Sequence, residues 1–214
     1  MSSPEHDERP LPSAVLTARF AEAVRWASHL HADQCRKGTN IAYISHLLAV
    51  ASLVLEDGGT EEDAIAGVLH DAIEDCHVAE AEIRARFGGP VAEIVVACTE
   101  PPGPDGQRLP WEVRKPRYLE HLERDDLPAG AFRVASADKL HNARSILSDL
   151  REHGPGVWDR FTKGAADQRD YYDRVASILG ARHDSVVTRE LRRVVDELVA
   201  AIDADGTTRD AERP

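Results

Sequence analysis

The chain has 214 residues and a net charge of −12, which gives enough length for one large domain or two small ones and no overall basic excess. The acidic balance argues against a nucleic-acid partner, although a small anionic ligand can still bind a locally basic pocket. Three cysteines indicate no disulfide framework and favour the reducing cytoplasm, while the polar N-terminus and the short longest apolar run, residues 47–55, argue against a signal peptide and a membrane span.

The two ends of the chain differ from the rest. Residues 1–12 contain three prolines and residues 205–214 lack apolar spacing, so both are predicted to be disordered tails. Between them, apolar residues recur at helical spacing almost throughout. We therefore expect one domain, residues 13–204.

Start and stop signals divide the first half of this domain into helices. Thr60, followed by Glu62 and Asp63, is typical of a helix start. Gly88-Gly89 followed by Pro90 is typical of one helix ending and the next beginning. The predicted helices cover residues 15–35, 47–55, 61–73, 79–87 and 91–99.

A segment rich in Pro and Gly, residues 100–109, interrupts the helical pattern. We interpret it as a loop that covers or contacts a substrate. The pattern then resumes, with a turn at residues 127–130 and a stop at residues 154–156. No strand pattern is present, so the predicted fold class is all-α, a single helical bundle. The remaining predicted helices cover residues 110–124, 131–151, 157–179 with a break at Gly164, and 185–202.

The stretch GVLHDAIEDC, residues 67–76, places four ionisable side chains directly after an apolar run. Such side chains are rarely buried unless they are paired or bound to a metal ion. On a continuous helix, His70 and Glu74 would share one face. Asp71 and Asp75 would share the neighbouring face. Two rows of carboxylates facing a core would repel each other without a cation.

Further polar residues lie inside apolar helical segments, namely His46 in one, and Asp138 with Asn142 one turn later in another. Alone, each is more typical of a hydrogen-bonded core residue. Together, His46, His70, Asp71 and Asp138 offer two imidazoles and two carboxylates. Mixed ligation of this kind suits Mn²⁺, Fe²⁺ or Zn²⁺ with positions left for water or substrate. A divalent ion so held can polarise a phosphoryl oxygen, which is the chemistry of a phosphohydrolase.

The order of these residues resembles that of the HD-domain phosphohydrolases. The similarity is greatest to the RelA/SpoT-type guanosine tetraphosphate hydrolases, and among them to the small alarmone hydrolases of the metazoan SpoT homologue type. It extends over residues 20–172 and is carried by the motifs CRKGTNIAYISH, VLHDAIED, FGGPVAEIV, VRK and ADKLHNAR. The resemblance implies a single HD-domain helical bundle.

The resemblance also implies a role for each matching residue. The two imidazoles and two carboxylates would hold one divalent metal ion, usually Mn²⁺, with Fe²⁺ and Zn²⁺ as alternatives. Glu74 and Asp75 would orient and deprotonate the attacking water. The residues expected to contact the substrate are Arg36, Lys37, Tyr43, Asn142 and Tyr171.

Each substrate residue also has a simpler interpretation. Arg36 and Lys37 could be a solvated helix end favoured by the helix dipole. Tyr43 and Tyr171 could pack in the core, and Asn142 could be an ordinary interior amide. No partner is assigned to the remaining histidines of the central chain, His29, His31, His77, His121, His141 and His153.

One departure from the family leaves the substrate open. Trp111, in LPWEVRK, stands where the alarmone hydrolases often carry a lysine that reaches a phosphate. Trp can stack on a base but cannot neutralise phosphate charge. The first hypothesis is a guanosine 3′,5′-bis(diphosphate) 3′-pyrophosphohydrolase. The alternatives are an HD-domain nucleotidase or NADPH 2′-phosphatase, and a nucleotide sensor without catalysis, which would have no need of Glu74 and Asp75.

Overall fold

The computed structural model describes residues 16–211, with side chains up to residue 204. Within this range every regular element is helical, apart from one isolated bridge between Cys35 and Ala42, so the predicted all-α class is confirmed. The expected tail of residues 1–12 lies outside the described residues. The helices are α1 Ala18–Leu30, α2 Ile44–Glu56, α3 Glu61–Leu69, α4 Ala72–Cys76, α5 Glu80–Phe87, α6 Gly89–Cys98, α7 Trp111–Leu122, α8 Ala129–His153, the 3₁₀ helix η1 Gly154–Arg160, α9 Ala165–Arg182 and α10 Val186–Ala211.

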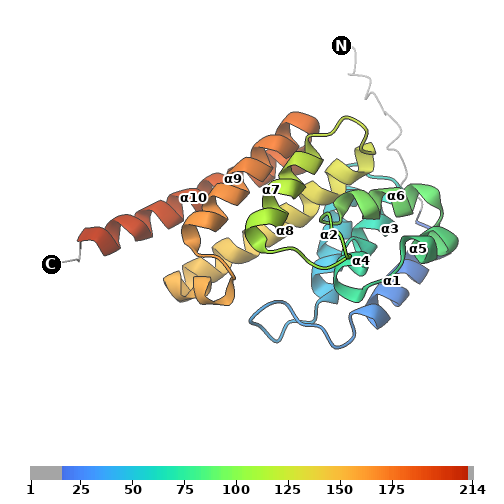
Figure 1. The fold of residues 1–214 in the computed structure, drawn as a ribbon, viewed down its shortest axis with the longest axis horizontal. Helices are drawn as coiled ribbons and strands as arrows, with labels where there is room; N and C mark the ends of the chain where they lie inside the picture. Colours follow the sequence, from blue (N-terminus) through green and yellow to red (C-terminus); the bar gives the residue numbers. More distant parts are fainter. Residues whose placement is uncertain (1–15, 212–214) are drawn as a thin grey trace, which may run out of the picture.

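Helix α8 connects the two ends of the molecule. It packs against α2, α3 and α6 on one side and against α9 and α10 on the other. In Figure 1, α1 to α6 gather at one end, while α9 and α10 lie side by side and lead to the C-terminus at the other. The buried apolar side chains of these helices form one continuous core. None of the described helices is long and apolar enough to cross a membrane.

The predicted helix starts are largely confirmed. Thr60 caps α3 through a capping box in which its side chain accepts from the Asp63 backbone and the Asp63 side chain accepts from the Thr60 backbone. Pro90 lies in the first turn of α6, where its missing N–H costs nothing. Gly164 is the extended N-cap of α9, which confirms the predicted break there.

The expected continuous helix over residues 61–73 is wrong. Helix α3 ends at Leu69 and α4 begins at Ala72, with His70 and Asp71 in the turn between them. Both turn residues keep right-handed backbone angles, with φ/ψ of −58°/−29° and −96°/0°. Because the chain stays in the same region of φ/ψ space, the apolar period continues through the break and does not reveal it. The turn, not a shared helix face, places the two side chains.

The second half of the chain also differs in detail from the prediction. The expected stop at residues 154–156 instead begins η1, which continues to Arg160. Helix α10 continues to Ala211, beyond the expected end at Ile202, which is the last buried apolar residue among its described side chains. Apolar spacing reports which residues are buried, whereas backbone hydrogen bonds extend a helix past them. The disorder predicted for residues 205–214 stays a prediction.

Candidate active site

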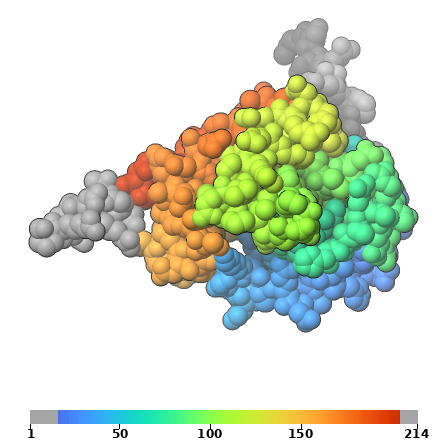
Figure 2. Space-filling view, in the orientation of Figure 1, coloured from blue at the N-terminus to red at the C-terminus, as the bar shows by residue number. Residues whose placement is uncertain are grey.

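A cleft of about 1320 Å³ opens where several elements meet around α8. In Figure 2 the surface is hollowed where the blue loop after α1, the green α7 region and the orange η1–α9 region approach one another. Every residue predicted to take part in the site lines this cleft except His46, which lies behind it with 1% of its surface exposed. The structure thus brings the whole predicted set together.

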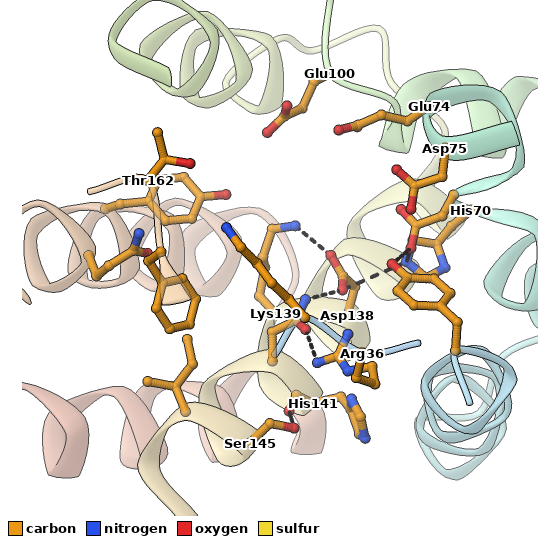
Figure 3. Close-up of a pocket in the computed structure, with 18 of the residues that line it drawn as sticks. Arg36, His70, Glu74, Asp75, Glu100, Asp138, Lys139, His141, Ser145 and Thr162 are labelled. Carbon is orange, nitrogen blue, oxygen red and sulfur yellow. Dashed lines mark hydrogen bonds and ion pairs between the residues drawn. The ribbon is translucent and has the colours of Figure 1, made fainter. Parts of the chain in front are cut away.

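Three helical regions contribute the candidate metal ligands. His46 lies in the first turn of α2, His70 and Asp71 in the turn after α3, and Asp138 in the middle of α8. The ligand atoms of His46, His70 and Asp138 all lie within 4.8 Å of one another. His46 Nε2 is 3.2 Å from Asp138 Oδ1, and His70 Nε2 is 3.0 Å from Asp71 Oδ2. Figure 3 shows Asp138 and His70 facing each other in the cleft.

His70 presents a free nitrogen to this cluster. Its Nδ1 lies 2.9 Å from the carbonyl oxygen of Gly67, which can only accept, so Nδ1 carries the proton. Nε2 therefore points towards the carboxylates. It is buried and has no hydrogen-bond partner among the described residues, although Asp71 Oδ2 is close. A buried polar atom without a partner is costly, so the geometry fits a nitrogen that binds a cation.

His46 is oriented by His141, for which no partner was predicted. Its Nδ1 lies 2.8 Å from Nδ1 of His141. Burial, together with the nearby His46 and Arg36, lowers the pKa of His141 to about 4, so this ring is neutral at pH 7 and can accept. With Nδ1–H of His46 donated to His141, Nε2 of His46 is left free towards Asp138.

The electrostatics of the cluster favour a cation. Burial opposes ionisation of Asp138, but Lys139, whose Nζ is 2.5 Å from Oδ2, outweighs it and holds the pKa well below the usual value. Burial also opposes ionisation of Asp71, but His70 outweighs it and lowers the pKa. Burial disfavours the charged form of His70, but Asp71 and Asp138 outweigh it and raise the pKa well above 6.5. The carboxylates that attract a proton to this ring would equally attract a divalent ion, which the donor set fits.

A second group of charges lies at the other side of the cleft. Glu74 Oε1 is 2.8 Å from Arg108 and 3.9 Å from Arg114. Glu100 pairs with Arg114 and, at 2.7 Å, with Lys115. Figure 3 shows the Glu74 and Glu100 carboxylates pointing towards each other. Burial, with a smaller contribution from Glu100, raises the pKa of Glu74 to about 6, which is a value suited to a general base at neutral pH.

The predicted substrate residues connect to the cluster or remain open to the cleft. Arg36 donates to Asn142 Oδ1 at 2.7 Å, and Asn142 Nδ2 donates to Asp138 Oδ1 at 2.5 Å. Asn142 is therefore no ordinary interior amide. The Tyr43 hydroxyl donates to Asp71 Oδ2 at 2.7 Å. Tyr171 is 5% exposed, and its hydroxyl lacks a hydrogen-bond partner within the described part of the chain.

Sequence reasoning missed several residues of the site. Lys139 and His141 lie next to predicted residues within ADKLHNAR, so their position in that motif was an available signal. Glu100 lies at the start of the Pro-rich segment and gave none. Lys37, which was predicted, lies at the edge of the cleft with its Nζ 5.6 Å from the centre of the Phe161 ring.

The chain is similar in sequence and fold to known proteins. The HD domain family matches residues 23–163. A relative from Xenopus tropicalis, the guanosine-3′,5′-bis(diphosphate) 3′-pyrophosphohydrolase MESH1, is 34% identical over 66% of this chain and 74% of its own length. The crystal structure of lmo0812 from Listeria monocytogenes has a TM-score of 0.64 and 31% identity, and covers 72% of this chain and 99% of its own. The structure of a metazoan ortholog of SpoT shares the fold, with a TM-score of 0.68 and 23% identity over 86% of this chain and 95% of its own.

The fold and the cluster of imidazoles and carboxylates define a metal-dependent phosphohydrolase. The chain belongs to the HD-domain family, and the geometry of its site agrees with the resemblance seen in the motifs. Among named relatives it is similar to the MESH1-type pyrophosphohydrolases.

Proposed function

We propose that this protein removes the 3′-pyrophosphate from guanosine tetra- or pentaphosphate in a reaction that requires Mn²⁺. Water would be consumed, and GDP or GTP and pyrophosphate would be released. The observation that carries the proposal is the joining, in one cleft, of a metal-ligand cluster, a pair of carboxylates and several cationic side chains. The relatives named as guanosine-3′,5′-bis(diphosphate) 3′-pyrophosphohydrolases support this substrate.

The metal ion would be held by His46, His70, Asp71 and Asp138. When bound, it would polarise a phosphoryl oxygen and acidify water, which Mn²⁺, Fe²⁺ and Zn²⁺ can all do. We choose Mn²⁺ on the resemblance of the motifs. The protein's own contribution would be to hold ligand atoms of His46, His70 and Asp138 within 4.8 Å of one another, with Asp71 Oδ2 3.0 Å from His70 Nε2.

Glu74 and Asp75 would act on the attacking water. Glu74, with its raised pKa, would accept the proton, because a base works best when its pKa is near the working pH. Asp75, the next residue of α4 and also in the cleft lining, would orient the same water. Neither carboxylate is needed by a protein that only binds a nucleotide.

The substrate would be held by side chains on both sides of the metal cluster. Arg36 and Lys37 would offset phosphate charge from the loop after α1, and Asn142 would contact the ribose. Tyr43 and Tyr171 would line the same path, with the Tyr171 hydroxyl placed to form a hydrogen bond with the substrate. Arg108, Arg114 and Lys115 could offset further charge in place of the lysine that Trp111 replaces.

A substrate panel tests the proposal. The purified protein is loaded with Mn²⁺ and given guanosine tetraphosphate, guanosine pentaphosphate, NADPH and nucleoside monophosphates, with phosphate and pyrophosphate release measured separately. Release of pyrophosphate from the guanosine substrates is the expected result. Metal binding without turnover of any nucleotide would instead identify a sensor.

Trp111 favours a second candidate, the removal of a phosphate from another nucleotide such as NADPH. It is the first residue of α7, lines the cleft and meets the Tyr171 ring edge-on, with 6.3 Å between ring centres. An aromatic wall at this place suits stacking on a second base or a nicotinamide more than it suits a pyrophosphate. In the same panel, phosphate release from NADPH that exceeds pyrophosphate release would support this candidate.

We also propose that residues 13–204 form the functional unit and that the protein acts in the cytoplasm. The family match lies inside this range, and the three cysteines, Cys35, Cys76 and Cys98, are free thiols, as expected in a reducing compartment. Fractionation of cells that produce the protein would test the location.

A further inference from the structure

Gln34, a residue of the loop after α1, forms a hydrogen bond with Asp75. Gln34 Nε2 donates to Asp75 Oδ2 at 2.8 Å, and both residues line the cleft. The backbone fixes Gln34 on both sides, because its N–H donates to the His31 carbonyl at 3.1 Å and its carbonyl accepts from Tyr43 N–H at 2.9 Å. The amide therefore reaches Asp75 from a rigid support.

The orientation of the Gln34 amide follows from its two neighbours. A carboxylate can only accept, so the NH₂ end of the amide must face Asp75. The oxygen end, Oε1, then lies 2.6 Å from His31 Nδ1. An amide oxygen can only accept, so His31 must carry its proton on Nδ1. The opposite orientation of the amide would place two acceptors against each other at Asp75.

His31 is itself fixed in place. It is 3% exposed and stacks on the Tyr43 ring with 5.1 Å between ring centres and 20° between ring planes. Cys76 Sγ also contacts the ring, 3.6 Å from Nδ1 and 3.5 Å from Nε2. A buried ring in contact with both an aromatic ring and a thiol cannot turn away from Gln34 without moving its neighbours.

We propose that Gln34 is a positioning residue for Asp75, and that His31 fixes the direction in which the Gln34 amide donates. By occupying Oδ2, Gln34 sets the plane of the carboxylate, so that the other oxygen meets the attacking water in one direction. This inference rests on the proposed function, in which Asp75 orients that water. It adds two residues that act through Asp75 and do not themselves touch the reacting atoms.

Gln34→Leu removes the donated hydrogen bond and keeps a side chain of similar bulk. We expect kcat to fall about tenfold or more, because a misdirected group loses the benefit of orientation. KM should stay within about twofold, since a residue that acts only on the water does not change substrate binding. Mn²⁺ affinity, measured by calorimetry, should not change. A raised KM with unchanged kcat would make Gln34 a substrate contact and overturn the inference.

A double-mutant cycle with Asp75→Asn is the decisive measurement. If Gln34 acts through Asp75, Gln34→Leu should lower kcat by less than about twofold when Asp75→Asn is already present. An equal loss in both backgrounds would show that Gln34 acts independently of Asp75, and the inference would fail.

Variants of His31 test the orientation of the amide. His31→Leu should reproduce the loss of kcat seen in Gln34→Leu, while His31→Gln should recover part of it, because its amide N–H can still donate to Gln34 Oε1. His29→Gln is the matched control, since His29 is exposed on the helix that precedes His31. If His31→Leu does not fold, the double-mutant cycle of Gln34→Leu and Asp75→Asn still tests whether Gln34 acts through Asp75.

One measurement separates this inference from the proposed function. Nitrogen-15 NMR of the Zn²⁺-loaded protein, which is diamagnetic, reports which nitrogen of His31 carries the proton without any need for turnover. Protonation at Nδ1, with a shift of the Gln34 amide signal in Asp75→Asn, supports the inference even if no nucleotide is hydrolysed. Protonation of a neutral His31 at Nε2 would overturn it, whatever the activity of the protein.

Discussion

At the scale of single residues, the cleft places one carboxylate in surroundings that raise its pKa. Burial, then Glu100, raises the pKa of Glu74 to about 6, while Arg108 opposes the shift. Glu74 is thus ionised at neutral pH and still basic enough to take a proton. Glu74→Gln keeps the size of the side chain and removes the base, so we expect kcat to fall by about 10²–10⁴-fold.

The metal content separates this effect from damage to the cluster. Glu74→Gln should bind Mn²⁺ as the wild type does, whereas His70→Ala should lose the metal, as shown by metal analysis of the purified proteins. Glu120→Gln, an exposed residue of α7, is the control and should keep full activity. Full turnover in Glu74→Gln would remove this residue from the mechanism.

His141 acts on the cluster through His46. Its Nδ1 lies 2.8 Å from Nδ1 of His46. When the neutral His141 ring accepts the proton of His46 Nδ1, Nε2 of His46 is left free for a metal ion. We expect His141→Ala to weaken Mn²⁺ binding by about 10–100-fold, the usual effect of removing such a partner, as measured by calorimetry. His153→Ala, an exposed residue of the same helix, should bind Mn²⁺ normally. Equal affinities in the two variants would contradict this role.

The residues of the metal cluster show which parts of the site the sequence could predict and which it could not. His70 and Asp71 were found because their motif follows an apolar run, and a motif is local. The contact of His46 with His141 joins residues 95 positions apart, and that of His31 with Cys76 joins residues 45 apart. Such contacts depend on how helices pack, which the spacing of residues along one helix does not contain.

At the scale of the elements, apolar spacing predicted the helices well but not the break between α3 and α4. The break matters, because it directs the side chains of His70 and Asp71 towards the candidate metal ligands His46 and Asp138. Where capping residues are present, as at Thr60, the prediction of a helix start was correct. A helix boundary can therefore be predicted from the sequence when a capping side chain satisfies the free N–H groups. It cannot be predicted when the backbone only bends and no capping residue is present.

Two glycines in helices should respond in opposite ways to the same substitution. A Cβ on Gly130, in the first turn of α8, would overlap Asp63 Oδ1 and lie 2.6 Å from Ile94 Cδ1. Asp63 cannot easily move, because it closes the α3 capping box and pairs with Arg133 at 2.7 Å. Gly130→Ala should therefore lower the free energy of unfolding by about 1–3 kcal/mol.

Gly180 lies inside α9, where an added Cβ would meet no atom of the described residues within 4 Å. Gly180→Ala should raise the free energy of unfolding by about 0.5–1 kcal/mol, because alanine loses less backbone entropy in a helix. Urea unfolding of the two variants measures both changes. A loss of stability in Gly180→Ala would show that the space beside α9 is not open.

At the scale of the whole molecule, the two groups of helices that pack against α8 are also linked at Asp57, which lies just after α2. Its side chain is 1% exposed, and its Oδ2 lies 2.8 Å from His183 Nε2, at the end of α9. Its Oδ1 accepts from Val187 N–H at 3.2 Å, in the first turn of α10, and Arg133 of α8 is 3.5 Å away. One carboxylate thus ties four helices together.

Asp57→Asn should destabilise the protein in a manner that depends on pH. Burial opposes ionisation of Asp57, but hydrogen bonds from His183, Ser185 and Val187 outweigh it and lower the pKa below 3.8. Because the folded pKa is the lower one, the carboxylate stabilises the fold fully above the unfolded pKa, and this contribution is lost as the pH falls through the folded pKa. At pH 7 we expect Asp57→Asn to cost about 3 kcal/mol, since it removes a buried charge from its partly buried partners His183 and Arg133.

Urea unfolding of the wild type and Asp57→Asn from pH 7 down to pH 3 measures this dependence. The difference in free energy of unfolding should be constant near neutral pH and shrink below about pH 4, as the wild-type carboxylate begins to take up a proton. Asp126→Asn, whose side chain is 66% exposed, should change stability by less than about 0.5 kcal/mol. A difference that stayed the same down to pH 3 would show that Asp57 joins the helices through its shape and hydrogen bonds, and that its charge contributes nothing.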